Sequence, residues 1–576
     1  MENFTEKSTW RKAFVTAVAI NVFFLALCLI FGDIKYGAID DYFMAAILTG
    51  AHGTAYNPHL VFVNAIYGYA LIPLYKLFPT VGWYYIGEMF AVFLGLTTIS
   101  YILIRRLGQQ WGTIIAALFT ALFASDFYLV VQFTQCASIL SAAGMLAFAN
   151  AITSRTAQSE QSTQAEQRKS ARFLPFATLA FAVFLLLWGS IMRWQAFLMG
   201  MPFFALGLLF LIKDCWRARY RTIAALAVMF MGAFAMHDFD RKLYQDESFK
   251  AYNEIQGPRV QFGDNGNYNQ NATYEDAEEW GLSGKDYHML TDWTFYDTET
   301  FSPEKLKAYS RIVGNYGDKS YNENIPAELL KALGHSLKSP IFWTWFIFCL
   351  LIYATNKNKA KSLYLWASLG TVFALMATLL AKGRLVYRVE SGFWLYTACL
   401  AIPLVNEIRF KLNKKIFAAA LAIIAAANIA TYASSGETVR DPSTGSKRTL
   451  AIEDTTDYEQ VFKYIGQNKD KMFLLSMNAY MRFSHHKMPP YKAEPIGSYY
   501  NTISFGYWTP YLPEVTQALK EYGITNPIKD VVNPNVIVIN EGGFQDFLQR
   551  HYYDSVAVDT LKIIGEMNFY KYRLVE

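Results

Sequence analysis

Long apolar runs recur along this chain from Trp10 to Tyr432, and they constrain its fold more than any other feature. A helix needs roughly 20 apolar residues to cross a hydrocarbon core of about 30 Å. Backbone polar groups inside that core must bond to one another, so each crossing is expected to be helical. The sequence therefore predicts a polytopic α-helical membrane protein with about 11 transmembrane helices.

Composition agrees with this class, because 53% of the residues are hydrophobic and only 17% are charged. Soluble domains carry about 25% charged residues. Several apolar segments are shorter than a full crossing, so their ends are expected to extend into the flanking residues. The predicted spans are residues 12–31, 82–104, 112–124, 127–151, 173–190, 194–212, 222–236, 340–354, 363–380, 392–404 and 415–432.

The orientation of the chain follows from Lys and Arg, which are retained in short cytoplasmic loops. Basic residues occupy every second loop, provided that the apolar segment 60–78 lies in the outer interface without crossing. We therefore expect a multi-pass cell-membrane protein with a cytoplasmic N-terminus. Its predicted domains are a transmembrane domain, 1–432, with outer loops at 32–81 and 237–338, and an extracytoplasmic α/β domain, 433–576.

The C-terminal region changes from apolar runs to short alternating patterns after Tyr432. These patterns predict a small α/β domain. Gly542-Gly543 follows a predicted strand and suggests either a phosphate-binding turn or a plain strand-to-helix turn. The predicted helices are 458–468, 513–522 and 543–552, and the predicted strands are 472–476, 536–540 and 568–574.

Several function classes are disfavoured. A net charge of +5 is small for 576 residues, and the basic residues flank apolar runs, so nucleic acid is not an expected partner. All five cysteines lie in or beside apolar segments, which leaves the polar regions without a disulfide framework. The chain contains no P-loop, HExxH, paired CxxC or GxSxG motif.

Two adjacent acids, Asp40 and Asp41, come just after the first predicted span and open a short apolar segment. Acids at a helix N-terminus are favoured by exposed N–H groups and by the helix dipole, so one interpretation of the pair is a helix cap plus solvation. The functional interpretation is that an aspartate between bilayer and water is partly desolvated. It then has raised basicity and can take a proton from an acceptor hydroxyl.

Three cations, Lys382, Arg384 and Arg388, break the positive-inside pattern in a short outer loop. A substrate phosphate or an anionic lipid headgroup would explain them, because the arginine fork donates two parallel hydrogen bonds to phosphate. The alternative is that they pair with Glu390 or with the acidic outer loop.

The second outer loop, between Asp238 and Glu299, is rich in acids and aromatics. Both suit a sugar-binding surface, because carboxylates accept hydrogen bonds from sugar hydroxyls while aromatic rings cover the C–H faces of the sugar. The same aromatics could instead form the core of the loop. A divalent cation is a further possibility, with His237 and Asp238 as weak ligand candidates beside Asp40. The candidate acceptor residues are Trp280, Tyr287, Asp292 and Trp293.

Short motifs, most of them in the first 150 residues and one at 384–403, resemble those of a known superfamily. Asp40-Asp41-Tyr-Phe-Met follows the first span, His52-Gly53 comes next, and the segment 384–403 opens on an arginine. In these features the chain resembles the GT-C superfamily of membrane glycosyltransferases, which includes protein O-mannosyltransferases and lipid A aminoarabinose transferases. No WWDYG-like motif of oligosaccharyltransferase subunits is present.

The resemblance implies a sugar donor on a polyprenyl phosphate carrier and inverting transfer to a glycan, lipid or protein acceptor at the outer membrane face. It implies that Asp40 is the general base and that Asp41 is an alternate base or a metal contact. Lys382, Arg384 and Arg388 would bind the donor phosphate. A second outer acid of the family corresponds to Asp126 or Asp238.

Two other function classes remain open. A transporter or flippase of lipid-linked saccharides would also have many spans, although the chain shows no inverted repeat. A noncatalytic assembly protein for cell-surface polymer would keep the outer domains and tolerate the loss of Asp40.

Overall fold

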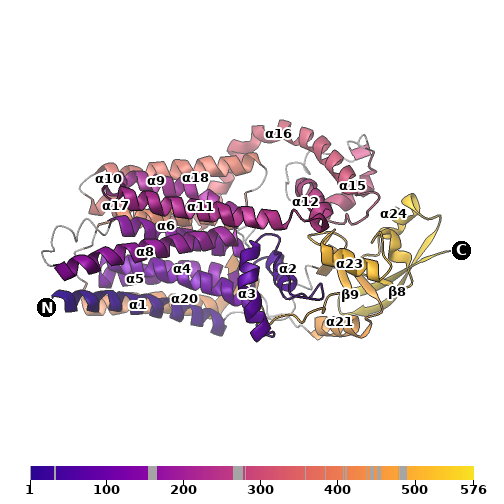
Figure 1. The fold of residues 1–576 in the computed structure, drawn as a ribbon, viewed down its shortest axis with the longest axis horizontal. Coiled ribbons are helices and arrows are strands. Elements are labelled where there is room, and N and C mark those ends of the chain that lie inside the picture. The colour runs from indigo at the N-terminus through magenta and orange to yellow at the C-terminus, as the bar shows by residue number, and fades with distance from the viewer. Residues whose placement is uncertain are drawn as a thin grey trace.

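A computed structural model shows a helix bundle that carries a small sheet domain at one end (Figure 1). The N-terminus lies at the opposite end of the bundle. This architecture confirms the predicted fold class of apolar helices followed by a C-terminal α/β domain. The described residues are 2–31, 34–153, 165–263, 277–278, 281–356, 359–382, 385–406, 408, 412–435, 437–440, 447–450, 456–477, 479–480 and 490–575.

Each predicted span corresponds to a helix of the bundle. Among the described residues, five helices are long and apolar enough to cross a membrane, or six if the pair 325–338 and 340–355, bent by 80°, forms one span. The helices are α1 (Glu2–Phe31), α4 (Trp83–Leu107), α5 (Gln109–Ala124), α6 (Phe133–Thr153), α8 (Ala165–Met192), α9 (Trp194–Phe210), α11 (Arg219–Leu243), α17 (Pro340–Thr355), α18 (Tyr364–Ala381), α19 (Tyr387–Ala401) and α20 (Lys414–Ser435).

Helix α6 is the centre of the bundle and packs against α4, α8, α9 and α19. It begins at Phe133, six residues after the predicted start of this span. The preceding residues instead form a π-helix, η1 (Ser125–Leu129), and a short strand, β2 (Val130–Val131), which pairs with β1 (Lys35–Tyr36). Single π-helical turns are frequent at functional sites, because they redirect the side chains that they carry.

Two short helices lie at the end of the bundle nearer the sheet domain. Helix α2 (Ile39–Leu48) lies between the bundle and the domain, and α3 (Ala65–Leu77) runs across the bundle end (Figure 1). The backbone N–H of Ala65 donates to Asp240 Oδ1 at 2.7 Å, which ties the start of α3 to α11. A crosswise helix of 13 residues is the arrangement expected for a segment that does not cross.

The second polar loop forms η2 (Glu247–Phe249), α12 (Lys250–Gly263), α15 (Gly284–Thr291) and the long α16 (Pro303–Lys338). Ser283 and Ser302 cap α15 and α16, each accepting from a backbone N–H of the first turn. The loop therefore has its own helical structure and reaches the sheet domain (Figure 1).

The C-terminal domain is built on a five-stranded sheet with strand order β6-β5-β7-β9-β8. Strands β6, β5 and β7 are parallel, and β9 and β8 complete the sheet in antiparallel pairing. The sequence predicted β5, β7, β9 and the three helices but missed β6 and β8. The elements are β3 (Glu437–Arg440), β4 (Lys447–Leu450), α21 (Thr456–Gln467), β5 (Met472–Leu475), β6 (Thr502–Ser504), α23 (Pro513–Glu521), η5 (Lys529–Val532), β7 (Val536–Ile539), α24 (Phe544–His551), β8 (Val556–Ile564) and β9 (Met567–Leu574).

The turn at Gly542-Gly543 connects β7 to α24. The backbone N–H of Gly543 donates to Glu541 Oε1 at 2.9 Å, so a carboxylate already occupies the place where a phosphate would bind. This favours the plain strand-to-helix turn over the phosphate turn.

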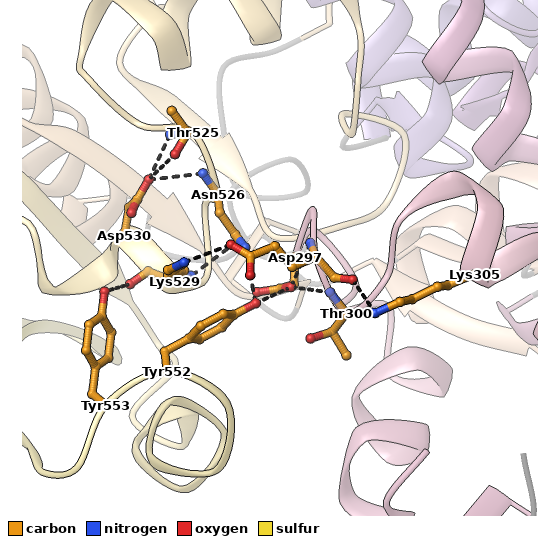
Figure 2. A network of polar contacts seen from close by, with 10 residues as sticks. Asp297, Thr300, Lys305, Thr525, Asn526, Lys529, Asp530, Tyr552 and Tyr553 are labelled. Carbon is orange, nitrogen blue, oxygen red and sulfur yellow. Dashed lines mark hydrogen bonds and ion pairs between the residues drawn. The ribbon is translucent and has the colours of Figure 1, made fainter. Parts of the chain in front are cut away.

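A polar network joins the second loop to the C-terminal domain (Figure 2). Asp297 is fully buried, and its Oδ1 accepts from the Tyr552 hydroxyl and from the Thr300 N–H, both at 2.7 Å. Lys529 pairs with Glu299 at 2.8 Å beside it. Because a buried carboxylate needs its donors, this network fixes the position of the domain on the loop.

Replacing Tyr552 with Phe removes one donor from buried Asp297 and is expected to cost about 1–3 kcal/mol of stability. The melting temperature of the detergent-purified protein should fall by a few degrees. Tyr553→Phe is the matched control, because among the described residues the Tyr553 hydroxyl donates to the Lys529 backbone carbonyl, at 3.2 Å, and not to a buried carboxylate. Equal melting temperatures for the two variants would contradict the role of the network.

Candidate functional site

Helix α2 begins with the two acids that the sequence singled out. Its N-cap, Ala38, is extended and supplies no side-chain cap, so both carboxylates lie in a first turn with exposed N–H groups. Successive helical residues point about 100° apart, which sends the two side chains into different surroundings. Asp40 faces the C-terminal domain and is partly exposed, whereas Asp41 is completely buried.

Two aromatic residues of the C-terminal domain hold the Asp40 carboxylate. The Tyr507 hydroxyl donates to Asp40 Oδ1 at 2.6 Å, and the Trp508 indole N–H donates to the same oxygen at 2.9 Å. Neither bond uses Oδ2. A carboxylate oriented in this way by neutral donors can take a proton from a hydroxyl at its second oxygen.

Asp41 has the opposite environment. Its Oδ1 accepts from the Tyr84 hydroxyl at 3.1 Å and from the Phe133 N–H, at the start of α6, at 3.3 Å. Burial raises the pKa of the Asp41 carboxyl, and the charge of Asp40 raises it further. Glu88 of α4 is also completely buried and interacts with Asp41. Asp41 is therefore suited to remain protonated.

An arginine of the second loop lies against the rings of Trp508 and Trp293. Arg259 of α12 is only 2% exposed, and its Cζ lies 3.7 Å from the centroid of Trp508 and 4.8 Å from that of Trp293. Its Nε donates to Gln256 Oε1 at 2.8 Å. Cation–π contacts between desolvated groups are stronger than those at exposed sites. The second loop thus fixes the indole that donates to Asp40.

The backbone is strained where these segments meet. Trp293 and Tyr507 both lie in the left-handed region, with φ of 62° and 64°. The N–H groups of Phe295 and Tyr296 donate to the Phe505 carbonyl at 3.2 and 2.7 Å, which joins the two strained segments. Such strain persists only where the surrounding structure over-determines it, and it gathers at functional sites.

A tyrosine-rich cleft lies between α2 and the C-terminal domain, with a volume of about 750 Å³ that includes open solvent at its mouth. The Tyr480 ring, which lines the cleft, lies 5.5 Å from the ring of Tyr507, so one ring contact separates the cleft from the residue that holds the Asp40 carboxylate. The lining includes Tyr36, Tyr42, Tyr75, Tyr480, Tyr499, His52, Lys492 and Glu494.

The predicted phosphate-binding cations are only partly described. Lys382 ends α18 and is exposed, Arg388 lies half-buried in the first turn of α19, and Arg384 falls outside the described residues. Next to Arg388, the Tyr387 hydroxyl donates to Asp126 Oδ2, in the π-helix, at 2.9 Å.

The first turn of α19 lies at the same end of the bundle as Asp41. The Phe133 N–H, at the start of α6, donates to Asp41. Five residues later, α6 packs closely against α19, since a Cβ added to Gly392 of α19 would lie 2.9 Å from the Ser138 Oγ. One helical turn separates Gly392 from Arg388. The start of α19 therefore lies at the same end of the bundle as the acids of α2.

The predicted acceptor residues separate into different surroundings. Tyr287 is buried in the second loop, as expected if the loop aromatics form its core, and Asp292 is exposed and pairs with His288 at 3.2 Å. Trp293 reaches the Asp40 site through its contacts with Tyr507 and Trp508. Trp280 falls outside the described residues.

The candidate metal ligands lie apart from Asp40. His237 stacks on Trp194 with ring centroids 4.5 Å apart, and Asp238 pairs with Arg241 and Lys242, each at 2.8 Å. Within the described part of the chain, no three His, Cys, Asp or Glu side chains gather into a group that could hold a metal ion. These residues therefore do not fit the suggested cation site.

Sequence reasoning missed Glu88, Arg259, Tyr507 and Trp508. An acid inside an apolar helix is a functional signal by default, so Glu88 could have been found in this way. Arg259 and the Tyr507-Trp508 pair carry no local signal beyond a high density of aromatic residues around Trp508.

The fold and the site together define a membrane protein with a carboxylate and a tyrosine-lined cleft at one end of its helix bundle. No protein-family model matches the sequence, and no curated protein matches it.

Two solved structures are similar to the chain over nearly its whole length. One is ArnT from Cupriavidus metallidurans bound to undecaprenyl phosphate, 11% identical over 96% of this chain and 97% of that chain, with a TM-score of 0.40. The other is the same protein in the apo state, 11% identical over 98% of each chain, with a TM-score of 0.42. ArnT is a lipid A aminoarabinose transferase of the GT-C superfamily, which the sequence also resembles. At this identity and TM-score, the likeness assigns no role to any residue of this chain.

Proposed function

We propose that this protein is an inverting glycosyltransferase that uses a polyprenyl-phosphate-linked sugar donor and modifies a glycan, lipid or protein acceptor at the outer face of the membrane. The observation that carries this proposal is the Asp40 carboxylate, held at Oδ1 by Tyr507 and Trp508, with a tyrosine-lined cleft one ring contact away, at Tyr480. Tyrosine rings and hydroxyls suit sugar faces and sugar hydroxyls, respectively.

In this scheme, Asp40 Oδ2 takes the proton from an acceptor hydroxyl. The hydroxyl oxygen attacks the anomeric carbon of the donor, the bond from that carbon to the phosphate oxygen breaks, and polyprenyl phosphate leaves. A protonated Asp41 places no second negative charge beside Asp40, so the approach of an anionic donor is less disfavoured. Of the two candidates for a second acid, Asp126 lies beside α19, whereas Asp238 is exposed and paired with cations.

The cations at the start of α19 would stabilise the negative charge on the leaving phosphate. We expect Arg388→Ala to raise the KM for the donor at least tenfold, because a hydrogen bond to a charged group contributes about 1.5–3 kcal/mol. The KM for the acceptor should stay near the wild-type value. Steady-state kinetics with each substrate varied in turn measures both constants. Arg105→Ala, an exposed arginine at the C-terminal end of α4, is the control.

Equal losses in donor and acceptor KM for Arg388→Ala would contradict the phosphate role. Such losses would indicate a general disturbance of α19.

The glycosyltransferase proposal is tested with purified protein in proteoliposomes and a panel of radiolabelled polyprenyl-phosphate sugars. A transferase releases polyprenyl phosphate and moves the label to an acceptor or to water. A flippase would move the intact labelled lipid across the bilayer, and an assembly protein would do neither. Release that is unchanged in EDTA would remove the suggested divalent cation from the reaction.

A further inference from the structure

A second, polar groove adjoins the tyrosine-lined cleft. It lies between the end of α2 and helix α23, and its volume is about 720 Å³ with open solvent at the mouth included. His52 lines both hollows, so they meet at this residue. The groove is lined by Ile47, Gly50, His52, Gly53, Thr54, Ala55, Tyr56, Asn57, Tyr500, Pro513, Glu514 and Gln517.

The walls of this groove are held by backbone bonds between distant segments. The Gly497 N–H donates to the Gly50 carbonyl at 3.0 Å, and the Tyr499 N–H donates to the Ala51 carbonyl at 2.8 Å. Gly50 has φ +72°, and a Cβ there would lie 2.2 Å from the Ala55 carbonyl oxygen, so this turn requires glycine. A groove formed by such contacts is present before any ligand binds.

The polar groups in the groove are oriented. Asn57 Oδ1 accepts from the His59 N–H at 2.9 Å, which directs Asn57 Nδ2 to donate to Glu514 Oε1 at 3.2 Å. Burial raises the pKa of Glu514. Among the described residues that line the groove there is no lysine or arginine, and Glu514 is acidic, so these residues disfavour phosphate and other anions. Amide, hydroxyl and carboxyl groups beside tyrosines favour uncharged hydroxyl-rich ligands.

The position of the groove relates it to the Asp40 site. Asp40 is in the first turn of α2 and Ile47 is in the last, so about 10 Å of helix separates the carboxylate from the groove. The chain between Trp508 and Glu514 also joins the two sites. From Asp40, the path to the groove runs past Tyr507 and Tyr480 into the cleft and then past His52, and an extended acceptor with its hydroxyl at Asp40 would follow this path.

We infer that the groove of Asn57, Glu514 and Gln517 is a second saccharide subsite, which binds an uncharged sugar unit of an oligosaccharide acceptor at a distance from the reacting hydroxyl. This inference rests on the proposed glycosyltransferase function. It identifies the acceptor as an oligosaccharide or polysaccharide chain in place of a single sugar.

The test is direct binding of the full-length detergent-purified protein to an array of neutral oligosaccharides of four or more units and their matching monosaccharides. We expect at least one oligosaccharide to bind tenfold or more tightly than its monosaccharide. Gln517→Trp, which fills the groove, should abolish that preference, and Glu514→Gln should weaken it three- to tenfold. Lys520→Trp is the control, because Lys520 is exposed on the same helix but does not line the groove.

Binding of no oligosaccharide, or a preference that survives Gln517→Trp, would overturn the subsite. Each variant's melting temperature is measured alongside, and Glu514→Gln keeps the side-chain shape should the tryptophan variant unfold. Donor cleavage by the wild-type protein is assayed separately. Absent cleavage with intact groove-dependent binding refutes the glycosyltransferase function, whereas cleavage without groove-dependent binding refutes only the subsite.

Discussion

Asp40→Asn is expected to lower sugar transfer by about 10²–10⁴-fold, the range that general base catalysis contributes. The asparagine oxygen can still accept from Tyr507 and Trp508, whose bonds both go to Oδ1. The side chain keeps its shape, so the fold and membrane insertion should be unchanged. The substitution removes only the basic oxygen that would take the acceptor proton. Initial rates of label transfer in proteoliposomes measure the loss.

Two matched variants make this result specific. Asp238→Asn changes an exposed, ion-paired acid in α11 and should leave transfer at the wild-type rate. Asp41→Asn tests the alternate base. Because Asp41 is completely buried and its pKa is raised, the amide resembles its protonated form, and we expect a smaller loss than for Asp40→Asn. Normal product from Asp40→Asn, or a larger loss from Asp41→Asn, would remove Asp40 as the base.

Gly506→Ala is expected to reduce transfer more than tenfold and to lower the melting temperature. A Cβ on Gly506 would lie 1.9 Å from the carbonyl oxygen of Trp293 and 2.8 Å from its carbonyl carbon. Both contacts are with backbone, which cannot rotate away as a side chain would. The second loop and the end of β6 must therefore separate, and Tyr507, the next residue, must move relative to Asp40. Overpacking of this kind costs about 1–3 kcal/mol.

Gly466→Ala provides the control for this substitution. Gly466 lies in α21, and a Cβ there would meet no atom within 4 Å. Alanine is favoured over glycine inside a helix by about 1 kcal/mol, so this variant should be as stable as wild type or more stable. Wild-type transfer and melting temperature for Gly506→Ala would contradict the close packing of the second loop against the Asp40 site.

The apolar runs and their spacing were enough to predict the bundle helices. In lipid, the backbone polar groups of each segment must bond to one another within that segment, so a long apolar run by itself indicates a helix. The place of Asp40 and Asp41 in the first turn of a short helix was likewise predictable from local sequence, and the helical start at residue 39 agrees with it. The start of α6 was not predictable from local sequence. The residues before it form η1 and β2, because β2 pairs with β1, a strand that lies nearly one hundred residues earlier in the chain.

The site itself depends on contacts that no local pattern encodes. Tyr507 lies 467 residues after Asp40, and Arg259 reaches Trp508 from a third region of the chain. Hydrophobic periodicity is a property of neighbouring residues, so the sequence determined which segments are helical and where the acids begin a helix. Only tertiary packing decided that Asp40 would be held by two aromatic donors while Asp41 was buried beside Glu88. That difference in environment, created by the fold, separates the chemistry of two identical neighbouring side chains.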